Sequence, residues 1–408
     1  MQILNPSDLI ASISLNDFKF KTTKELLDNS MGYQPHIHGW VAQSEAKKAA
    51  LFGLNMRQGG FNLIVLGEHG SGRSSLMQSA MLEVAKQKSQ ISNLHDLVAI
   101  YDFEQLQQPT LVKLPVGAGQ KLRAEMDGFA RALMLEMPNF VVAENQQAML
   151  AQAEQWLINA IASLENALKD CKDSLNQYFK LISFETLAYL KAWQPSSSSE
   201  ADNNLEGLIS EAFFARFRVN LLVDNQNTLL QGLNQPIVYD NDPSLQSLFG
   251  GVEGASESSV LPNFLRLRAG NLHKADGGML LLHLRDLLND EQNGAQTIEK
   301  LHRFLRNGTL QIEDASSGAQ STSYVANNTL LPLQVKLVII ATREDFYDCL
   351  DEQPDFFNHF PIKVEFAERI LANVENYAAI AGFVAQKCVQ HQCAHFSKDA
   401  VAALIGAL

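Results

Sequence analysis

A glycine-rich stretch in the first quarter of the chain has the residue types and the spacing that bind phosphate. Residues 67–75 read GEHGSGRSS, which is the G-x-x-x-x-G-K-[ST] pattern with arginine in place of lysine. Glycines let the backbone curl so that several N–H groups face one phosphate chain, and a following helix adds the positive end of its dipole. We therefore predict a nucleotide phosphate-binding loop made of Gly67, Glu68, His69, Gly70, Ser71, Gly72, Arg73, Ser74 and Ser75.

Two side chains of this loop bear on its chemistry. The lysine of the usual pattern brings a compact ammonium to the phosphates, whereas the guanidinium of Arg73 keeps the charge with a different size and geometry. The hydroxyl of Ser74, or of its neighbour Ser75, is the expected Mg²⁺ ligand. The alternative for each serine is an ordinary helix N-terminal cap. The sequence thus predicts phosphate binding and leaves catalysis open.

The surrounding sequence predicts the elements that position this loop. An apolar run of strand length, Phe61–Leu66, enters it, and residues 76–88 leave it with helical spacing. Further strand candidates are Leu97–Phe103, Gly278–Leu284, Val335–Thr342 and Ile362–Phe366. Buried strands separated by helical stretches indicate a parallel sheet that is covered on both faces. We expect an α/β fold with three layers.

A long insertion separates the glycine loop from the strand at Gly278, because the interval is far longer than one crossover needs. Within it, apolar residues recur every three or four positions over about three heptads, which indicates a coiled-coil arm. The alternative is a long amphipathic helix that lies on its own domain. Residues 194–204 have the composition of a linker, and residues 314–328 that of an exposed loop. The residues of the seam are Leu157, Ile161, Leu164, Leu168, Cys171, Leu175, Tyr178 and Ile182.

The composition excludes several classes of protein. With 408 residues, 46% hydrophobic and 19% charged, and a formal net charge of −13, the chain is neither disordered nor a highly basic nucleic-acid binder. Its four cysteines are scattered too thinly for a disulfide scaffold, which favours a reduced, cytoplasmic protein. No apolar run approaches the length of a membrane span, so we expect no membrane insertion.

Several stretches together resemble the Lon-related ATP-dependent proteases, specifically the bacterial branch whose AAA+ domain carries a long insertion. The most specific is RAGNLHKADGGMLLLHLRDLL (Arg268–Leu288), which is similar to that family's R-x-G-x-L-H-x-A-N-G-G-x-L-x-L-x-x-R-x-L-L motif. The phosphate loop is similar as well, since the phosphate loop of this family also has arginine in place of lysine in some members. The other similar stretches are FKFKTTKELL (Phe18–Leu27), VAQSEAKKAALFGL (Val41–Leu54) and PTLVKLPVGAG (Pro109–Gly119).

This resemblance implies a P-loop NTPase module of the AAA+ type that binds ATP with Mg²⁺ and forms a homo-oligomeric ring, usually a hexamer. In the family, the module pushes unfolded protein substrates toward a Ser-Lys protease domain. No Ser-Lys dyad can be assigned in these residues, so we expect either a fragment or a protein that has lost its peptidase. The expected domains are an N-terminal segment (1–40), a first AAA+ part with the P-loop (41–140), an inserted helical arm and linker (141–205), a second AAA+ part (206–370) and a truncated helical lid (371–408).

The resemblance also exposes departures that bear on catalysis. The family's strand after Gly277-Gly278 ends in Asp-Glu, which hold Mg²⁺ and polarise the attacking water, but here the matching residues are His283 and Leu284. Losing a general base costs about 10²- to 10⁴-fold in rate, so hydrolysis should be slow or absent. Thr342 matches a residue that orients the water, or is simply a strand-terminal threonine. Asp102 and Asp286 are weaker substitutes for the metal role.

Two further clusters of side chains suggest other functions less strongly. Cys388, His391, Cys393 and His395 include zinc-binding residue types, but their spacing is not that of a known finger or ribbon. Residues 266–274 contain four basic side chains, a small island for nucleic acid in an acidic chain. The leading hypothesis is thus the ATP-binding, substrate-handling part of a Lon-like protease. The alternative is a non-hydrolysing protein in which bound nucleotide sets the oligomeric state.

Overall fold

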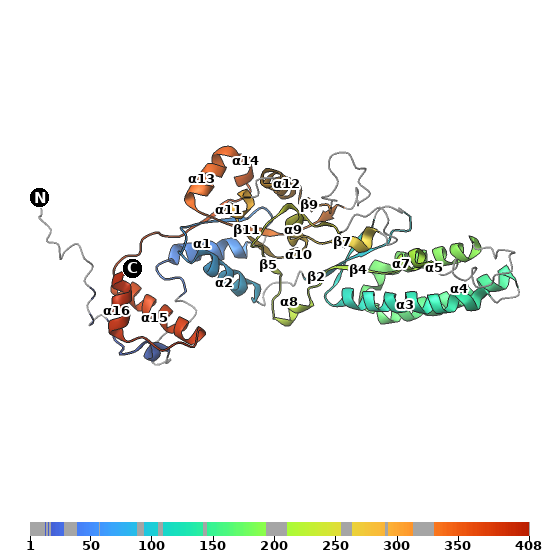
Figure 1. The fold of residues 1–408 in the computed structure, drawn as a ribbon, viewed down its shortest axis with the longest axis horizontal. Helices are drawn as coiled ribbons and strands as arrows, with labels where there is room; N and C mark the ends of the chain where they lie inside the picture. Colours follow the sequence, from blue (N-terminus) through green and yellow to red (C-terminus); the bar gives the residue numbers. More distant parts are fainter. Residues whose placement is uncertain are drawn as a thin grey trace, which may run out of the picture. The chain divides into compact units, whose positions relative to one another are not determined.

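The computed structural model describes residues 13, 15, 18–27, 39–56, 58–87, 94–104, 109–141, 145–192, 210–253, 263–289, 293–312 and 330–407 (Figure 1). The predicted linker at 194–204 and the predicted loop at 314–328 lie outside these residues. The chain divides into two compact units, one formed by residues 1–84 and 339–408 and the other by residues 85–338. Among the described residues, no helix combines the length and the apolarity needed to cross a bilayer.

The first unit contains the phosphate loop and both ends of the chain. Strand β1 (Leu63–Leu66) is fully buried and pairs in parallel with β12 (Ile362–Glu365). Gly53 lies so close to these strands that a Cβ there would be 2.9 Å from side-chain atoms of Ile362 and Leu63, which explains a glycine inside a helix. The helices among the described residues of this unit are η3 (Thr23–Leu27), α1 (Ser44–Asn55), α2 (Arg73–Ala85), α13 (Arg343–Glu352), α14 (Pro354–Phe357), α15 (Val374–Gln390) and α16 (Lys398–Ala407).

The N-terminal segment of this unit packs on its two last helices. Phe18 and Phe20 share a buried apolar cluster with Tyr377, Ala381, Val401 and Ile405. Thr23, which is fully buried, exchanges main-chain and side-chain hydrogen bonds with the chain at residues 395 and 396. Residues 18–27, which resemble a segment of the Lon-related family by sequence, therefore pack on α15 and α16.

The second unit contains a small antiparallel sheet with helices packed on it. This sheet has the strand order β3-β2-β4. The strands are β2 (His95–Ile100), β3 (Thr110–Pro115) and β4 (Asn220–Val223), and the helices that contact one another beside them are α3 (Ala118–Val141), α4 (Gln146–Ala167), α5 (Lys172–Ala192) and α7 (Glu211–Ala215). The start of α3 is held by the buried Asp96, whose carboxylate accepts hydrogen bonds from the backbone N–H groups of Gly117, Gly119 and Asn225.

The second unit also contains the parallel pair of strands β5 (Ile237–Tyr239) and β8 (Met279–His283). Strand β8 is almost wholly buried, as its apolar sequence predicts. The other elements are α8 (Gln226–Leu230), α9 (Leu245–Phe249), β6 (Gly251–Val252), η6 (Asn263–Arg266), β7 (Leu267–Arg268), α10 (Asn271–Lys274), α11 (Leu284–Leu288), α12 (Gly294–Asn307), β9 (Thr309–Leu310) and β10 (Leu331–Pro332).

The parallel sheet has five strands in the order β12-β1-β11-β8-β5, where β11 spans Lys336–Ala341. A parallel sheet with helices around it fits the predicted α/β P-loop fold. Four of the five predicted strands belong to it, but the strand predicted at Leu97–Phe103 does not: it forms β2 of the antiparallel sheet. The connection from β2 to β3 is too short for a parallel crossover, so the two strands pair antiparallel.

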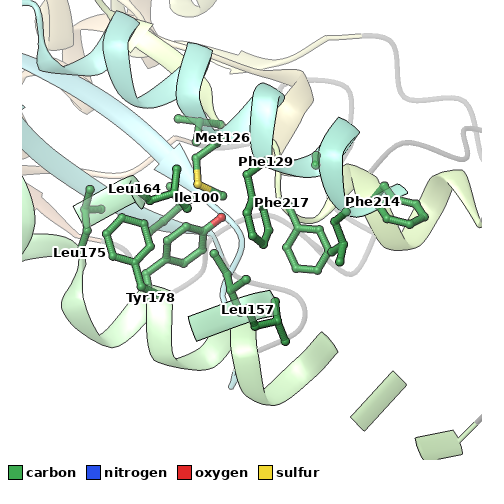
Figure 2. Packing of buried hydrophobic residues seen from close by; sticks show 14 of the residues in the cluster. Ile100, Met126, Phe129, Leu157, Leu164, Leu175, Tyr178, Phe214 and Phe217 are labelled. Carbon is green, nitrogen blue, oxygen red and sulfur yellow. The ribbon is translucent and has the colours of Figure 1, made fainter. Parts of the chain in front are cut away.

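The coiled-coil arm is not confirmed. The predicted seam is divided between two helices, α4 and α5, which contact each other and are joined through the 3-10 turn η5 (Lys169–Cys171). Leu168 and Cys171 of the seam lie in this connection. Helix α4 ends at Ala167, and the backbone of the next residue, Leu168, leaves the helical region. The apolar periodicity continues through the turn because both helices bury one face in the same core, together with residues of α3 and β2 (Figure 2).

Candidate functional site

The phosphate loop has the predicted order of strand, glycine turn and helix. Strand β1 ends at Leu66, and α2 begins at Arg73. Gly70 and Gly72 adopt positive φ angles of 84° and 78°, which L side chains rarely adopt, so the turn depends on these two glycines. A Cβ added at Gly67 would be 2.9 Å from the side chain of Phe366, so this position also favours glycine. The N–H of Gly67 donates a hydrogen bond to the carbonyl of Ala341 at the end of β11.

Arg73 points into the base of the loop. Its side chain is only 7% exposed, and Nη1 donates to the carbonyl oxygens of Gly67 and of Ala341, the latter at 2.7 Å. Burial lowers the pKa of the guanidinium, while the charges of Glu68 and Asp345 raise it. A guanidinium has five N–H donors, and three of them have no hydrogen-bond partner among the described residues. Arg73 therefore ties the ends of β1 and β11 together and retains donors for a phosphate group.

The remaining residues of the loop differ in their surroundings. Glu68 and His69 are exposed, and Ser71 carries a buried hydroxyl oxygen without a partner among the described residues. Ser74 is half-buried and Ser75 exposed, and both lie inside the first turn of α2 rather than at the cap position that precedes it. The loop thus combines glycine turns, a helix N-terminus, a buried cation and an unpaired hydroxyl, all of which suit a phosphate ligand.

Thr342 has a structural role in this arrangement. It is the residue before α13, and its Oγ1 accepts a hydrogen bond of 3.1 Å from the backbone N–H of Asp345. Asp345 is a residue that the sequence reasoning missed. The signal was present, because threonine followed three positions later by an acid marks the start of a helix.

This cap predicts a measurable stability effect. Thr342→Val keeps the shape of the side chain but removes the acceptor, and should lower the free energy of unfolding by about 1 kcal/mol. Thr342→Ser keeps the hydroxyl and should cost much less. Urea denaturation of both variants measures the difference, and equal costs would show that the hydrogen bond adds no stability.

The two residues that match the family's carboxylate pair are on the second unit, and neither is acidic. His283 is the last residue of β8, and Leu284 is the fully buried first residue of α11. Asp286 lies in the first turn of α11. Asp102 accepts hydrogen bonds from Thr110 Oγ1 and from its own loop at Glu104, which fits a role in holding that loop.

The part of the Arg268–Leu288 stretch that precedes β8 contains buried polar residues that stabilise the fold. Asp276 accepts from Lys113 Nζ at 2.5 Å and from the backbone N–H of Gln334, and pairs with His95 Nε2 at 2.9 Å. Burial raises the pKa of Asp276, but these hydrogen bonds outweigh that effect and lower it overall. His273 is buried, and burial lowers its pKa to about 4, so the ring is neutral at pH 7. Asp276 thus joins β2, β3 and the start of β8.

The basic cluster at residues 266–274 and the Cys/His cluster at residues 388–395 also make contacts within the chain. Arg266 and Arg268 both bond Glu253 across the β6-β7 pair. His395 Nδ1 is 3.1 Å from Thr23 Oγ1, Cys388 is buried and Cys393 is exposed. No group of three His, Cys, Asp or Glu side chains within the described ranges is arranged to hold a metal ion.

Comparison with known proteins gives one family. Residues 233–367, about a third of the chain, match the family model described as "LonB-like, AAA domain". This supports a Lon-related AAA+ module, and an AAA domain implies nucleotide binding, generally with Mg²⁺. The matched segment contains β8 and β11, whereas the phosphate loop lies before it in the sequence.

The other comparisons add little. No curated protein matches the chain. Among solved structures, the chain is similar to the crystal structure of NtrX from Brucella abortus, with 16% sequence identity over 57% of this chain and a TM-score of 0.26, which is too low to show a shared overall fold. The match spans about half, 49%, of the length of that protein's chain.

Proposed function

We propose that the chain binds ATP through residues 67–75 as the AAA+ module of a Lon-like ATP-dependent protease. In this role its nucleotide state is coupled to unfolding a protein substrate and delivering it to a Ser-Lys peptidase domain, within a homo-oligomeric ring. The loop carries the proposal, because positive φ angles at Gly70 and Gly72 shape the turn and Arg73 lies buried at its base. The family match to residues 233–367 supports the same module from an independent part of the sequence.

A second function is favoured by one specific observation. His283 ends β8, and Leu284 is a core residue. In the family that the chain resembles, these two positions carry the acid and the base for hydrolysis, and here neither residue can take that role. A module of this kind would bind ATP and turn it over very slowly. Nucleotide would then set the oligomeric state, and the protein would act as an assembly or interaction module. Both functions need nucleotide binding, and they differ in turnover.

Nucleotide binding is tested by Gly72→Asp. A carboxylate here repels the phosphates, and the residue is held at φ 78°, so we expect the affinity for ATP to fall by at least about 100-fold. Gly59→Asp is the matched control, since it adds the same charge at an exposed turn outside the loop, where a Cβ meets nothing within 4 Å. Isothermal titration calorimetry of the full chain measures both, and equal ATP affinity in Gly72→Asp and wild type would refute the loop assignment.

The two functions are separated by steady-state ATP turnover of the full chain, measured with and without an unfolded protein, alongside sedimentation with and without nucleotide. Turnover that the unfolded protein stimulates supports the protease module. Nucleotide-dependent assembly without turnover above background supports the assembly module. Absence of ATP binding would contradict both.

A further inference from the structure

One carboxylate oxygen of the first unit is buried without a hydrogen-bond donor. Oδ2 of Asp345 is inaccessible to solvent and has no partner among the described residues. A buried oxygen of an ionised carboxylate loses its hydration, and proteins usually compensate this with a donor, a water or a cation. The unpaired oxygen is therefore open to a donor, a water or a cation from outside the described residues.

Main-chain hydrogen bonds place this carboxylate beside the phosphate loop. Asp345 lies in the first turn of α13, and its backbone N–H is bonded to Thr342. The carbonyl of Ala341, directly before Thr342, accepts from both Arg73 Nη1 and the N–H of Gly67. The start of α13 is thus connected to both ends of the loop through one carbonyl group.

The charges agree with this placement. The negative charge of Asp345 raises the pKa of Arg73, against the larger effect of burial, which lowers it. Arg73 nevertheless donates to two carbonyl groups and not to Oδ2. The carboxylate is therefore near enough to interact with the loop's cation electrostatically, while its buried oxygen is not consumed by that interaction.

A simpler role for Asp345 is compensation of the dipole of α13. Glu344 stands in the same turn and is exposed, so it provides that compensation without the cost of burial. The hydrogen bond that caps the helix uses the backbone of Asp345 and not its carboxylate. Neither role accounts for a buried, unpaired oxygen.

We propose that Asp345 supplies the carboxylate for the divalent cation that accompanies the nucleotide, in place of the acid that is missing at His283 and Leu284. Mg²⁺ takes oxygen ligands and is commonly bound by one or two carboxylates together with phosphate groups, and the hydroxyl of Ser74 is a further oxygen of the same loop. This inference rests on the proposed binding of ATP by residues 67–75.

The experiment compares Asp345→Asn with Glu344→Gln in the full chain. The affinity for a non-hydrolysable ATP analogue is measured by calorimetry in Mg²⁺ and in EDTA. We expect wild type to bind about tenfold more tightly with Mg²⁺, since metal and nucleotide stabilise each other. Asp345→Asn should lose this gain and keep the affinity in EDTA. Glu344→Gln removes an exposed acid from the same turn and should behave as wild type.

The outcomes distinguish this inference from the proposed function. Retention of the Mg²⁺ gain by Asp345→Asn, or a wild type that binds the analogue equally with and without Mg²⁺, would overturn the inference and leave nucleotide binding intact. Absence of binding in every condition would overturn both. Asp345→Glu keeps a carboxylate at this position, so partial recovery of the Mg²⁺ gain, with a melting temperature like that of Asp345→Asn, supports the metal role over a structural one.

Discussion

Replacing His283 with aspartate and Leu284 with glutamate should raise the rate of ATP hydrolysis by about 10²-fold or more, because the pair supplies the acid and the general base that this position lacks. His283 is the last residue of β8 and Leu284 is the first residue of α11, so both substitutions fall at the carboxyl end of this strand. Steady-state release of phosphate by the full chain at saturating ATP measures the effect.

The control separates chemistry from folding. Leu284 is fully buried, so glutamate there costs about 2 kcal/mol of apolar burial before any effect of charge. His283→Asp combined with Leu284→Gln has the same size and nearly the same loss of burial but has no base, and it should remain as slow as wild type. If the glutamate and glutamine versions fold and bind ATP alike and hydrolyse it at the same rate, the end of β8 is not the position of the catalytic acids.

The proposed cation site provides a second test of His283→Asp. If Asp345 holds the metal in this chain, the new carboxylate should restore part of the Mg²⁺-dependent gain in ATP affinity that Asp345→Asn loses. Calorimetry of the double variant His283→Asp, Asp345→Asn in Mg²⁺ and in EDTA measures this recovery. An unchanged loss would mean that the residue at the end of β8 does not take part in cation binding.

The elements of the fold were predictable where sequence and local structure agree. A short apolar strand, glycines at turn positions and a helical spacing gave β1, the phosphate loop and α2. Burial on both faces does not distinguish parallel from antiparallel strands, and so Leu97–Phe103 was assigned to the wrong sheet. The break at Leu168 was missed because two helices that share one core show the same periodicity as one long helix.

The site was predictable only in part. The loop residues follow a known spacing, but the inward path of Arg73 to the carbonyl groups of Gly67 and Ala341 depends on β11, which lies more than 250 residues further along the sequence. The unpaired oxygen of Asp345 is a property of packing that no spacing reveals. Sequence patterns located the phosphate loop, whereas the side chains around it required the structure.

Gly278→Ala should be strongly destabilising, with a loss of about 3 kcal/mol or more in the free energy of unfolding of the second unit. A Cβ at this buried residue would be 2.0 Å from the backbone carbonyl oxygen of Pro236. That carbonyl cannot retreat cheaply, because it accepts the N–H of Met279 as β8 begins, while Gly278 itself accepts the N–H of Lys336. Thermal unfolding followed by circular dichroism measures the loss.

Gly128→Ala provides the contrast. Gly128 lies inside α3, and a Cβ there meets nothing within 4 Å, so alanine should stabilise the helix by about 0.5–1 kcal/mol. The two substitutions add the same atoms and should change stability in opposite directions. Equal effects would show that the close approach of Gly278 to Pro236 is not maintained in solution. Opposite effects would mean that glycine is required at 278 because the carbonyl of Pro236 lies directly against it at the start of β8.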